Sequence, residues 1–318
     1  MKITVLDGYT LNPDDLSWDE LAKLGEFTVY DRTASELILE RSAGSEILLT
    51  NKTPLMADTI SQLPDLKYIG VLATGYNVVD VKAASQNGVV VTNVPTYGTD
   101  SVAQMAFALL LALCRRVQVH SDAVKQGEWS QSEDFCFWKF PQVELSGKTM
   151  GIIGFGRIGR QVARIADAMG MRIIAADEFK TDPPQLNDFQ WSEIPDLLKT
   201  ADVVSLHCPQ TPDTESMINK ETIGLMKETA ILVNNSRGGL VVDDDLAEAL
   251  NSGRIAGAAL DVLSTEPPND NPLLKAKNCL ITPHISWATQ EARARLMDVA
   301  TKNVKAFQEG KPINMVAQ

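Results

Sequence analysis

The stretch that most constrains the fold is residues 149–177, TMGIIGFGRIGRQVARIADAMGMRIIAAD. It contains a short apolar strand, a GxGxxG turn, an amphipathic helix that ends at Gly170 and a second apolar strand that reaches Asp177. A GxGxxG motif alone is weak evidence. The order strand, turn, helix, strand and acid is typical of a dinucleotide-binding βαβ unit.

Each glycine of this turn has its own expected role. Gly154 permits the tight turn, Gly156 lets the backbone approach a pyrophosphate, and Gly159 lets the helix pack on the strand. The start of the helix offers N–H groups and a partial positive charge to the phosphates. Asp177 is expected to bind the ribose hydroxyls and, with Glu178, to repel a 2′-phosphate, which favours NAD over NADP. The alternative is a glycine-rich turn without a dinucleotide.

The rest of the chain alternates apolar strands with helical patterns. Strands are predicted at 3–6, 28–30, 47–50, 68–73, 89–92, 201–208, 230–234, 257–260 and 278–282. This alternation predicts parallel sheets covered by helices, and a length of 318 residues suggests two domains. We therefore predict an α/β fold with two doubly wound parallel-sheet domains and a cleft between them.

Two loops of the first domain follow predicted strands, at 50–52 and 73–77. Ligands of parallel sheets bind at the carboxyl ends of the strands. The small residues and the glycine of the second loop could offer backbone N–H groups to a carboxylate. Ordinary turn chemistry explains these loops equally well.

A long helix is predicted to open near Asp100, with Ser101 and Gln104 spaced as a capping box. From 102 to 114 only Gln104 is polar, so this helix must be buried on all sides, against its own domain and against the first domain or a second subunit. The run is too short to span a bilayer. The loop that follows is crowded with aromatic side chains, Trp129, Phe135, Phe137, Trp138 and Phe140. It is either an interface segment or a loop folded over its own domain.

Composition excludes several classes of protein. A net charge of −12 at pH 7 argues against nucleic acid and anionic membranes as partners, and it also fits mere solubility. The four cysteines lie far apart, so we expect no disulfide framework and no metal site, and the cytoplasm is the default location. The N-terminus has no signal-peptide pattern.

Three polar residues at strand ends could carry chemistry. The planar guanidinium of Arg237, between a buried strand and two glycines, suits a substrate carboxylate. Glu266 precedes two prolines, and His284 follows Pro283. A protonated imidazole can donate a proton to a carbonyl as hydride arrives and recover it in oxidation. From spacing alone, Glu266 could equally be an unpaired loop carboxylate.

Seven stretches carry a family resemblance that extends over essentially the whole chain. They are LATGYNVVD (72–80), VPTYGTDSVAQ (94–104), GIIGFGRIGRQVA (151–163), HCPQTPDT (207–214), NNSRGGLVV (234–242), ALDVLSTEPP (259–268) and TPHISWAT (282–289). The chain resembles the D-isomer-specific 2-hydroxyacid dehydrogenases. The resemblance implies a flavodoxin-like substrate domain, residues 1–97 plus 288–318, and a Rossmann NAD-binding domain, residues 98–287.

The resemblance also implies roles for individual residues. Arg237, Glu266 and His284 match the family's active site, with Glu266 hydrogen-bonded to His284 and Arg237 on the substrate. Backbone contacts from Thr74 and Gly75 to the substrate carboxylate are implied. The implied NAD contacts are Arg157, Ile158, Asp177, His207, Pro209, Thr214, Asn235 and Asp261. The aromatic loop resembles a dimerisation loop, so we expect a homodimer, with Trp138 as a candidate to reach the partner's substrate.

Finer features resemble one branch, the glycerate dehydrogenases or hydroxypyruvate reductases. They include TNKTPL (50–55) and Trp287, whereas Ser286 stands where that branch more often has alanine. We expect NAD-dependent interconversion of a small 2-oxo acid and its 2-hydroxy acid. The alternatives are a broad-specificity D-2-hydroxyacid dehydrogenase, a glyoxylate reductase, and an NAD(H)-sensing binding protein, since corepressors resemble this scaffold.

Overall fold

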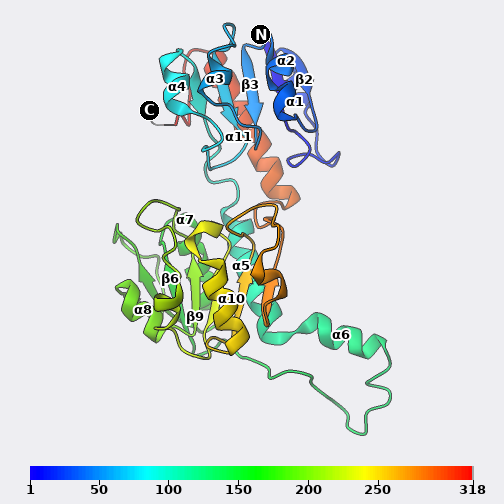
Figure 1. Cartoon of the computed structure of the whole chain (residues 1–318), viewed down its shortest axis with the longest axis vertical. Helices are drawn as coiled ribbons and strands as arrows, with labels where there is room; N and C mark the ends of the chain where they lie inside the picture. Colours follow the sequence, from blue (N-terminus) through cyan, green and yellow to red (C-terminus); the bar gives the residue numbers. More distant parts are fainter. Residues whose placement is uncertain (317–318) are drawn as a thin grey trace. The chain divides into compact units, whose positions relative to one another are not determined.

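The computed structural model describes residues 1–316, which form two compact units. Unit 1 comprises Met1–Gly98 and the segment from Trp287 onward, and unit 2 comprises Thr99–Ser286. The expected boundaries, after 97 and after 287, lie one residue from these. Both units contain a parallel sheet with helices (Figure 1), which confirms the predicted α/β class.

Unit 1 is built on a five-stranded sheet of order β2-β1-β3-β4-β5, in which every pair is parallel. Its strands are β1 (Lys2–Val5), β2 (Glu26–Val29), β3 (Ile47–Thr50), β4 (Tyr68–Val71) and β5 (Val90–Thr92). Its helices are α1 (Asp19–Ala22), η1 (Ser35–Leu37), α2 (Ile38–Ser42), α3 (Ala57–Ile60), α4 (Val81–Gln86) and α11 (Gln290–Gln308). Side chains alternate along β3: Ile47 and Leu49 join the core beneath α11, and Leu48 joins the core beneath α4.

Unit 2 is built on a seven-stranded parallel sheet of order β12-β11-β10-β9-β6-β7-β8. Its strands are β6 (Thr149–Ile153), β7 (Arg172–Ala176), β8 (Phe189–Trp191), β9 (Val203–Leu206), β10 (Ile231–Asn234), β11 (Gly257–Leu260) and β12 (Cys279–Ile281). Its helices are α5 (Thr99–Arg115), α6 (Val117–Lys125), α7 (Arg157–Ala168), α8 (Ile194–Thr200), α9 (Lys220–Ile223), η2 (Gly238–Leu240), α10 (Asp243–Ser252) and η3 (Pro272–Lys275). One core lies beneath α5 and α7, and the other beneath α8 and α10.

The long apolar helix α5 packs against α7 within unit 2, as its sequence requires. The predicted capping box is wrong, because α5 begins at Thr99 and Ser101 lies inside it. The hydroxyl of Ser101 instead donates to the carbonyl oxygen of Ser286 at 2.5 Å. The helix therefore starts upstream of the residue that the local pattern favours as its cap.

After α5 the chain bends at Arg116, which has a left-handed φ of 47°. We call α6 and the loop 126–142 the arm, because they project from the rest of unit 2 (Figure 1). The side chains of Phe135 and Trp138 in the arm are 89% and 68% exposed. This exposure favours an interface segment over a loop folded onto its own domain.

Within the described residues, no single helix has the length and apolar character to cross a bilayer. The consecutive helices α5 and α6 pass that test only as a pair, with a 55° bend between them.

Candidate active site

The glycine turn has the geometry that phosphate binding requires. Gly154 has a φ of 92°, and a Cβ there would lie 2.4 Å from the backbone nitrogen of Cys208. At Gly159 a Cβ would lie 2.2 Å from the carbonyl oxygen of Gly154, so the helix packs directly on the turn. At Gly156 a Cβ would meet nothing within 4 Å. The turn therefore leaves open space at the N-terminus of α7.

This open space suits the dinucleotide that the sequence motif predicts. No side chain within residues 1–316 caps the first turn of α7, which begins at Arg157 and Ile158. The uncapped N–H groups and the helix dipole favour an anion there. The residues present thus fit a pyrophosphate.

Asp177 follows β7 and is half-buried. Its Oδ2 accepts a hydrogen bond from the Phe155 backbone N–H at 2.5 Å, and its Oδ1 accepts one from the Phe179 N–H at 2.9 Å. These bonds fix the direction of the carboxylate beside the glycine turn. Each oxygen keeps a lone pair for a further donor, such as a ribose hydroxyl.

The loop after β9 contains three predicted NAD contacts. His207 donates its backbone N–H to Ile153, and its Nε2 lies 2.8 Å from the Ser205 hydroxyl. Burial lowers the pKa of His207 to about 4, so its imidazole is neutral at pH 7. His207 is therefore unsuited to donating a proton. Thr214 closes the loop by donating its hydroxyl to the Pro209 carbonyl oxygen at 2.7 Å.

Arg237, Glu266 and His284 come from three loops at one edge of the sheet, after β10, β11 and β12. A Cβ at Gly238 would lie 1.8 Å from the Leu263 carbonyl oxygen, so only glycine lets the first two loops touch. Glu266 accepts the Leu263 N–H with Oε1 at 3.1 Å, and its Oε2 lies 2.6 Å from Nδ1 of His284. The hydrogen bond between Glu266 and His284 that the resemblance implies is therefore present.

Asp261, at the end of β11, is buried and orients the loop of His284. Its carboxylate accepts three hydrogen bonds, from the Thr282 hydroxyl and from the N–H groups of Ile285 and Ser286, at 2.6, 2.9 and 2.7 Å. Its carbonyl oxygen accepts the His284 N–H at 2.8 Å. The left-handed φ of His284, 55°, is thus held by hydrogen bonds on both sides of the residue.

The backbone around Arg237 is fixed by Asn234. Its amide nitrogen donates to the Arg237 carbonyl oxygen at 2.8 Å, and its amide oxygen accepts the Ser236 N–H at 3.1 Å. The guanidinium donates to the Ser236 carbonyl oxygen at 2.8 Å, and the side chain is exposed. Most of its five N–H donors therefore remain available for a carboxylate.

In unit 1, Thr74 and Gly75 follow β4. The Thr74 hydroxyl donates to the Val94 carbonyl oxygen at 2.9 Å, and the Asn93 amide donates to the Thr74 carbonyl oxygen at 2.7 Å. Among residues 1–316, the backbone N–H groups of Thr74 and Gly75 have no hydrogen-bond acceptor. These N–H groups suit an incoming carboxylate.

Asp7, which sequence reasoning missed, organises this edge of unit 1. Its carboxylate accepts the N–H groups of three consecutive residues, Asn51, Lys52 and Thr53, at 2.8, 2.5 and 2.7 Å. The Asn51 amide in turn donates to the Leu72 carbonyl oxygen at 3.0 Å, beside the Thr74 loop. The available signal was an acid directly after the first strand, at the edge where ligands bind.

Asp7→Ala should raise KM for the 2-oxo acid about ten-fold and leave kcat and NADH affinity nearly unchanged, because three charge-assisted hydrogen bonds to the 51–53 turn disappear. Steady-state kinetics and NADH titration measure both effects. Glu46→Ala is the matched control, since the Glu46 carboxylate accepts hydrogen bonds from Lys2 and Lys67 at the opposite edge of the same strands. Equal KM changes in both variants would show that Asp7 has only a structural role.

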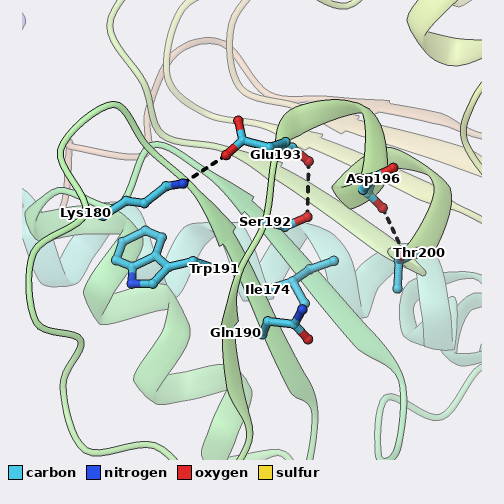
Figure 2. A pocket seen from close by; sticks show the side chains of 8 residues that line it. All are labelled: Ile174, Lys180, Gln190, Trp191, Ser192, Glu193, Asp196 and Thr200. Carbon is cyan, nitrogen blue, oxygen red and sulfur yellow. Dashed lines mark hydrogen bonds and ion pairs between the residues drawn. The ribbon is translucent and has the colours of Figure 1, made fainter.

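Figure 2 shows a depression in unit 2. Its volume is about 310 Å³, and its lining is Ile174, Lys180, Gln190, Trp191, Ser192, Glu193, Asp196 and Thr200. Lys180 and Glu193 form an ion pair across it at 2.9 Å. None of the predicted site residues lines this depression, so we assign it no part in the chemistry.

The structure therefore brings the predicted residues of unit 2 together at the carboxyl edge of its sheet, except Trp138, which lies on the arm. Thr74 and Gly75 belong to unit 1. Within residues 1–316, no group of three or more His, Cys, Asp or Glu side chains could hold a metal ion.

Comparisons with known proteins agree with this geometry. Residues 107–286 match the family described as "D-isomer specific 2-hydroxyacid dehydrogenase, NAD binding domain". The chain is 52% identical to a hydroxypyruvate reductase from Blautia hydrogenotrophica, over 99% of each chain. It is 41% identical to a glycerate dehydrogenase from Methylorubrum extorquens, over 99% of this chain and 98% of that one. The structure of an Aquifex aeolicus D-lactate dehydrogenase with NAD and lactic acid aligns with a TM-score of 0.84 at 29% identity, over 100% and 99% of the two chains.

Proposed function

The chain belongs to the D-isomer-specific 2-hydroxyacid dehydrogenase family, and from this premise we propose that it interconverts hydroxypyruvate and D-glycerate with NAD(H). Membership makes it an NAD-dependent oxidoreductase. The observation that carries the proposal is the 2.6 Å contact between His284 and Glu266, in the loop next to that of Arg237. The names of the two relatives supply the substrate.

We assign the chemistry to this group of three residues. NADH, when bound, supplies the hydride that forms the new C–H bond at C2 of the 2-oxo acid. His284 donates the proton that the carbonyl oxygen takes up, and it recovers this proton when the hydroxy acid is oxidised. Glu266, whose Oε2 lies 2.6 Å from Nδ1, orients the imidazole. Arg237 binds the substrate carboxylate and polarises the carbonyl, with backbone N–H groups of Thr74 and Gly75 also on the carboxylate.

We assign the cofactor to the edge of unit 2. The glycine turn and the start of α7 would hold the pyrophosphate, and Asp177 the adenosine ribose. The remaining contacts that we propose for NAD are His207, Pro209, Thr214, Asn235 and Asp261. Unit 2 then serves as the NAD-binding domain, and unit 1 as the substrate domain.

We further propose a homodimer formed through the arm. The exposed Phe135 and Trp138 are large apolar side chains that an interface would bury. Trp138 is the candidate to reach the substrate of the partner subunit. Cytoplasmic location is consistent with four cysteines that are all free thiols.

Asp177→Ala should weaken NADH binding about ten-fold and raise the ratio of kcat/KM with NADPH to that with NADH about 100-fold. The substitution removes both the acceptor for the ribose hydroxyls and the charge that repels a 2′-phosphate. Asp188→Ala is the control, because Asp188 pairs with Arg172 at the opposite end of β7. Unchanged cofactor selectivity in Asp177→Ala would reject the ribose assignment.

The substrate proposal is tested with a panel of hydroxypyruvate, glyoxylate and pyruvate, compared by kcat/KM with NADH. Hydroxypyruvate should give the highest value. A clear preference for glyoxylate would replace the proposal with a glyoxylate reductase, and comparable values for all three would indicate a broad-specificity dehydrogenase.

A further inference from the structure

The loop that contains Glu266 is not held in place by apolar packing. Residues 264–270 are all exposed, whereas Leu263 and Leu273 on either side of them are buried. Yet the site requires Glu266 to keep its Oε2 within 2.6 Å of Nδ1 of His284. A loop with no buried side chain of its own is ordered mainly by the hydrogen bonds that close it. Those hydrogen bonds must therefore fix Glu266 beside the imidazole.

Asp243, the first residue of α10, accepts hydrogen bonds from both ends of this loop. Its Oδ2 accepts the Ser264 hydroxyl at 2.5 Å and the side-chain amide of Asn271 at 2.6 Å. Asn271 is itself fixed, since its Oδ1 accepts the N–H of the buried Leu273 at 3.0 Å. Hydrogen bonds to an ionised acceptor are about twice as strong as those between neutral groups. One carboxylate oxygen thus closes the loop around Glu266.

The same aspartate also links the Glu266 loop to the Arg237 loop. Asp243 follows Arg237 in the chain after the short helix η2, and Gly238 of η2 lies against Leu263, where a Cβ would come within 1.8 Å of the Leu263 carbonyl oxygen. Among residues 1–316, the side chain of Asp243 is hydrogen-bonded only to the Glu266 loop. Any effect of this side chain on the chemistry therefore passes through Glu266.

We propose that Asp243 is a positioning residue for the reaction: by binding both ends of the loop it keeps Glu266 within hydrogen-bond distance of His284. The assignment rests on the proposed function, because it takes His284 as the proton donor. The two acids that follow Asp243 in α10 do not share this role. Asp244 is exposed, and Asp245 accepts the backbone N–H of Lys220, the first residue of α9, at 2.8 Å.

Asp243→Ala should lower kcat for hydroxypyruvate about ten- to 100-fold, because a shift of about 1 Å in a catalytic group costs up to that much in rate. KM and NADH affinity should stay close to the wild-type values, since Arg237 and the glycine turn keep their own contacts. Asp243→Asn retains an oxygen acceptor and should restore most of kcat. Ser264→Ala, at an exposed residue, removes one of the two bonds and should show the same loss at smaller size even if Asp243→Ala does not fold.

Asp245→Ala is the matched control, because it removes a half-buried acid and one hydrogen bond from the same turn of α10. It should lower Tm about as much as Asp243→Ala does and leave kcat unchanged. A double-mutant cycle adds a stricter comparison. In a Glu266→Ala background, Asp243→Ala should hardly change kcat, because no carboxylate remains to be positioned.

NMR of the imidazole nitrogens of His284, assigned with His284→Ala, reports the contact without any substrate. In Asp243→Ala their shifts should move toward those of Glu266→Ala, and in Asp245→Ala they should match the wild type. Additive losses of kcat in the cycle, imidazole shifts that do not move, or equal kcat losses in Asp243→Ala and Asp245→Ala would each overturn the assignment. Failure of the proposed reaction would be seen separately, as a wild-type protein that binds NADH without turnover.

Discussion

Replacing His284 with alanine should lower kcat about 100- to 10,000-fold and leave NADH affinity within a factor of two of the wild type. General acid catalysis by a positioned side chain contributes that range of rate enhancement. The NADH affinity should persist because the glycine turn and Asp177 belong to other loops. Stopped-flow measurement of NADH oxidation with saturating hydroxypyruvate, together with NADH titration, separates these effects.

A second variant separates proton transfer from folding. Glu266→Gln keeps a hydrogen-bonding side chain beside Nδ1 of His284 and removes the charge. It should retain more activity than His284→Ala, because the side chain can still orient the imidazole. Parallel losses of kcat and NADH affinity in His284→Ala would show instead that the residue is structural.

Arg237→Lys should lower kcat/KM for hydroxypyruvate about 10- to 100-fold, mostly through KM. Lysine keeps the positive charge but loses the planar pair of donors that binds a carboxylate in two places, and one hydrogen bond to a charged group accounts for a loss of this size. Arg237→Ala should lose more, because the charge disappears as well. Initial-rate kinetics over a range of 2-oxo acid concentrations give both constants.

The control for this substitution is Arg164→Lys. Arg164 is exposed on α7, and among the described residues its side chain is hydrogen-bonded only to Gln161 of the same helix, so its replacement should leave both constants unchanged. If Arg237→Lys were as active as the wild type, binding of the carboxylate would have to be assigned to another cation.

Local patterns were sufficient to predict the nucleotide-binding unit. The predicted strands around the GxGxxG turn coincide with β6 and β7, because a buried parallel strand appears in sequence as an unbroken apolar run. The φ of Gly154 and the close packing at Gly159 are the properties for which glycine is required. The two parallel sheets followed from the alternation of strands and helices.

Contacts between distant segments could not be predicted in this way. Residues 51–53 donate hydrogen bonds to Asp7, and the His284 loop donates hydrogen bonds to Asp261. Both sets of bonds join segments more than 20 residues apart, and nothing in the local pattern encodes them. Strand β8, with three residues and one exposed side chain among them, is too short to give a periodic signal. The pairing of Glu266 with His284 came from the resemblance, since spacing alone left it open. The predicted cleft stays a prediction.

The most direct test of the central claim is a single-turnover reaction of the wild-type protein with hydroxypyruvate and NADH, followed by chiral analysis of the product. We predict one D-glycerate for each NADH consumed. If calorimetry shows that NADH binds while neither hydroxypyruvate nor any other 2-oxo acid causes its oxidation, the assignment of Arg237, Glu266 and His284 to hydride chemistry is contradicted, and an NAD(H)-sensing binding protein becomes the better account.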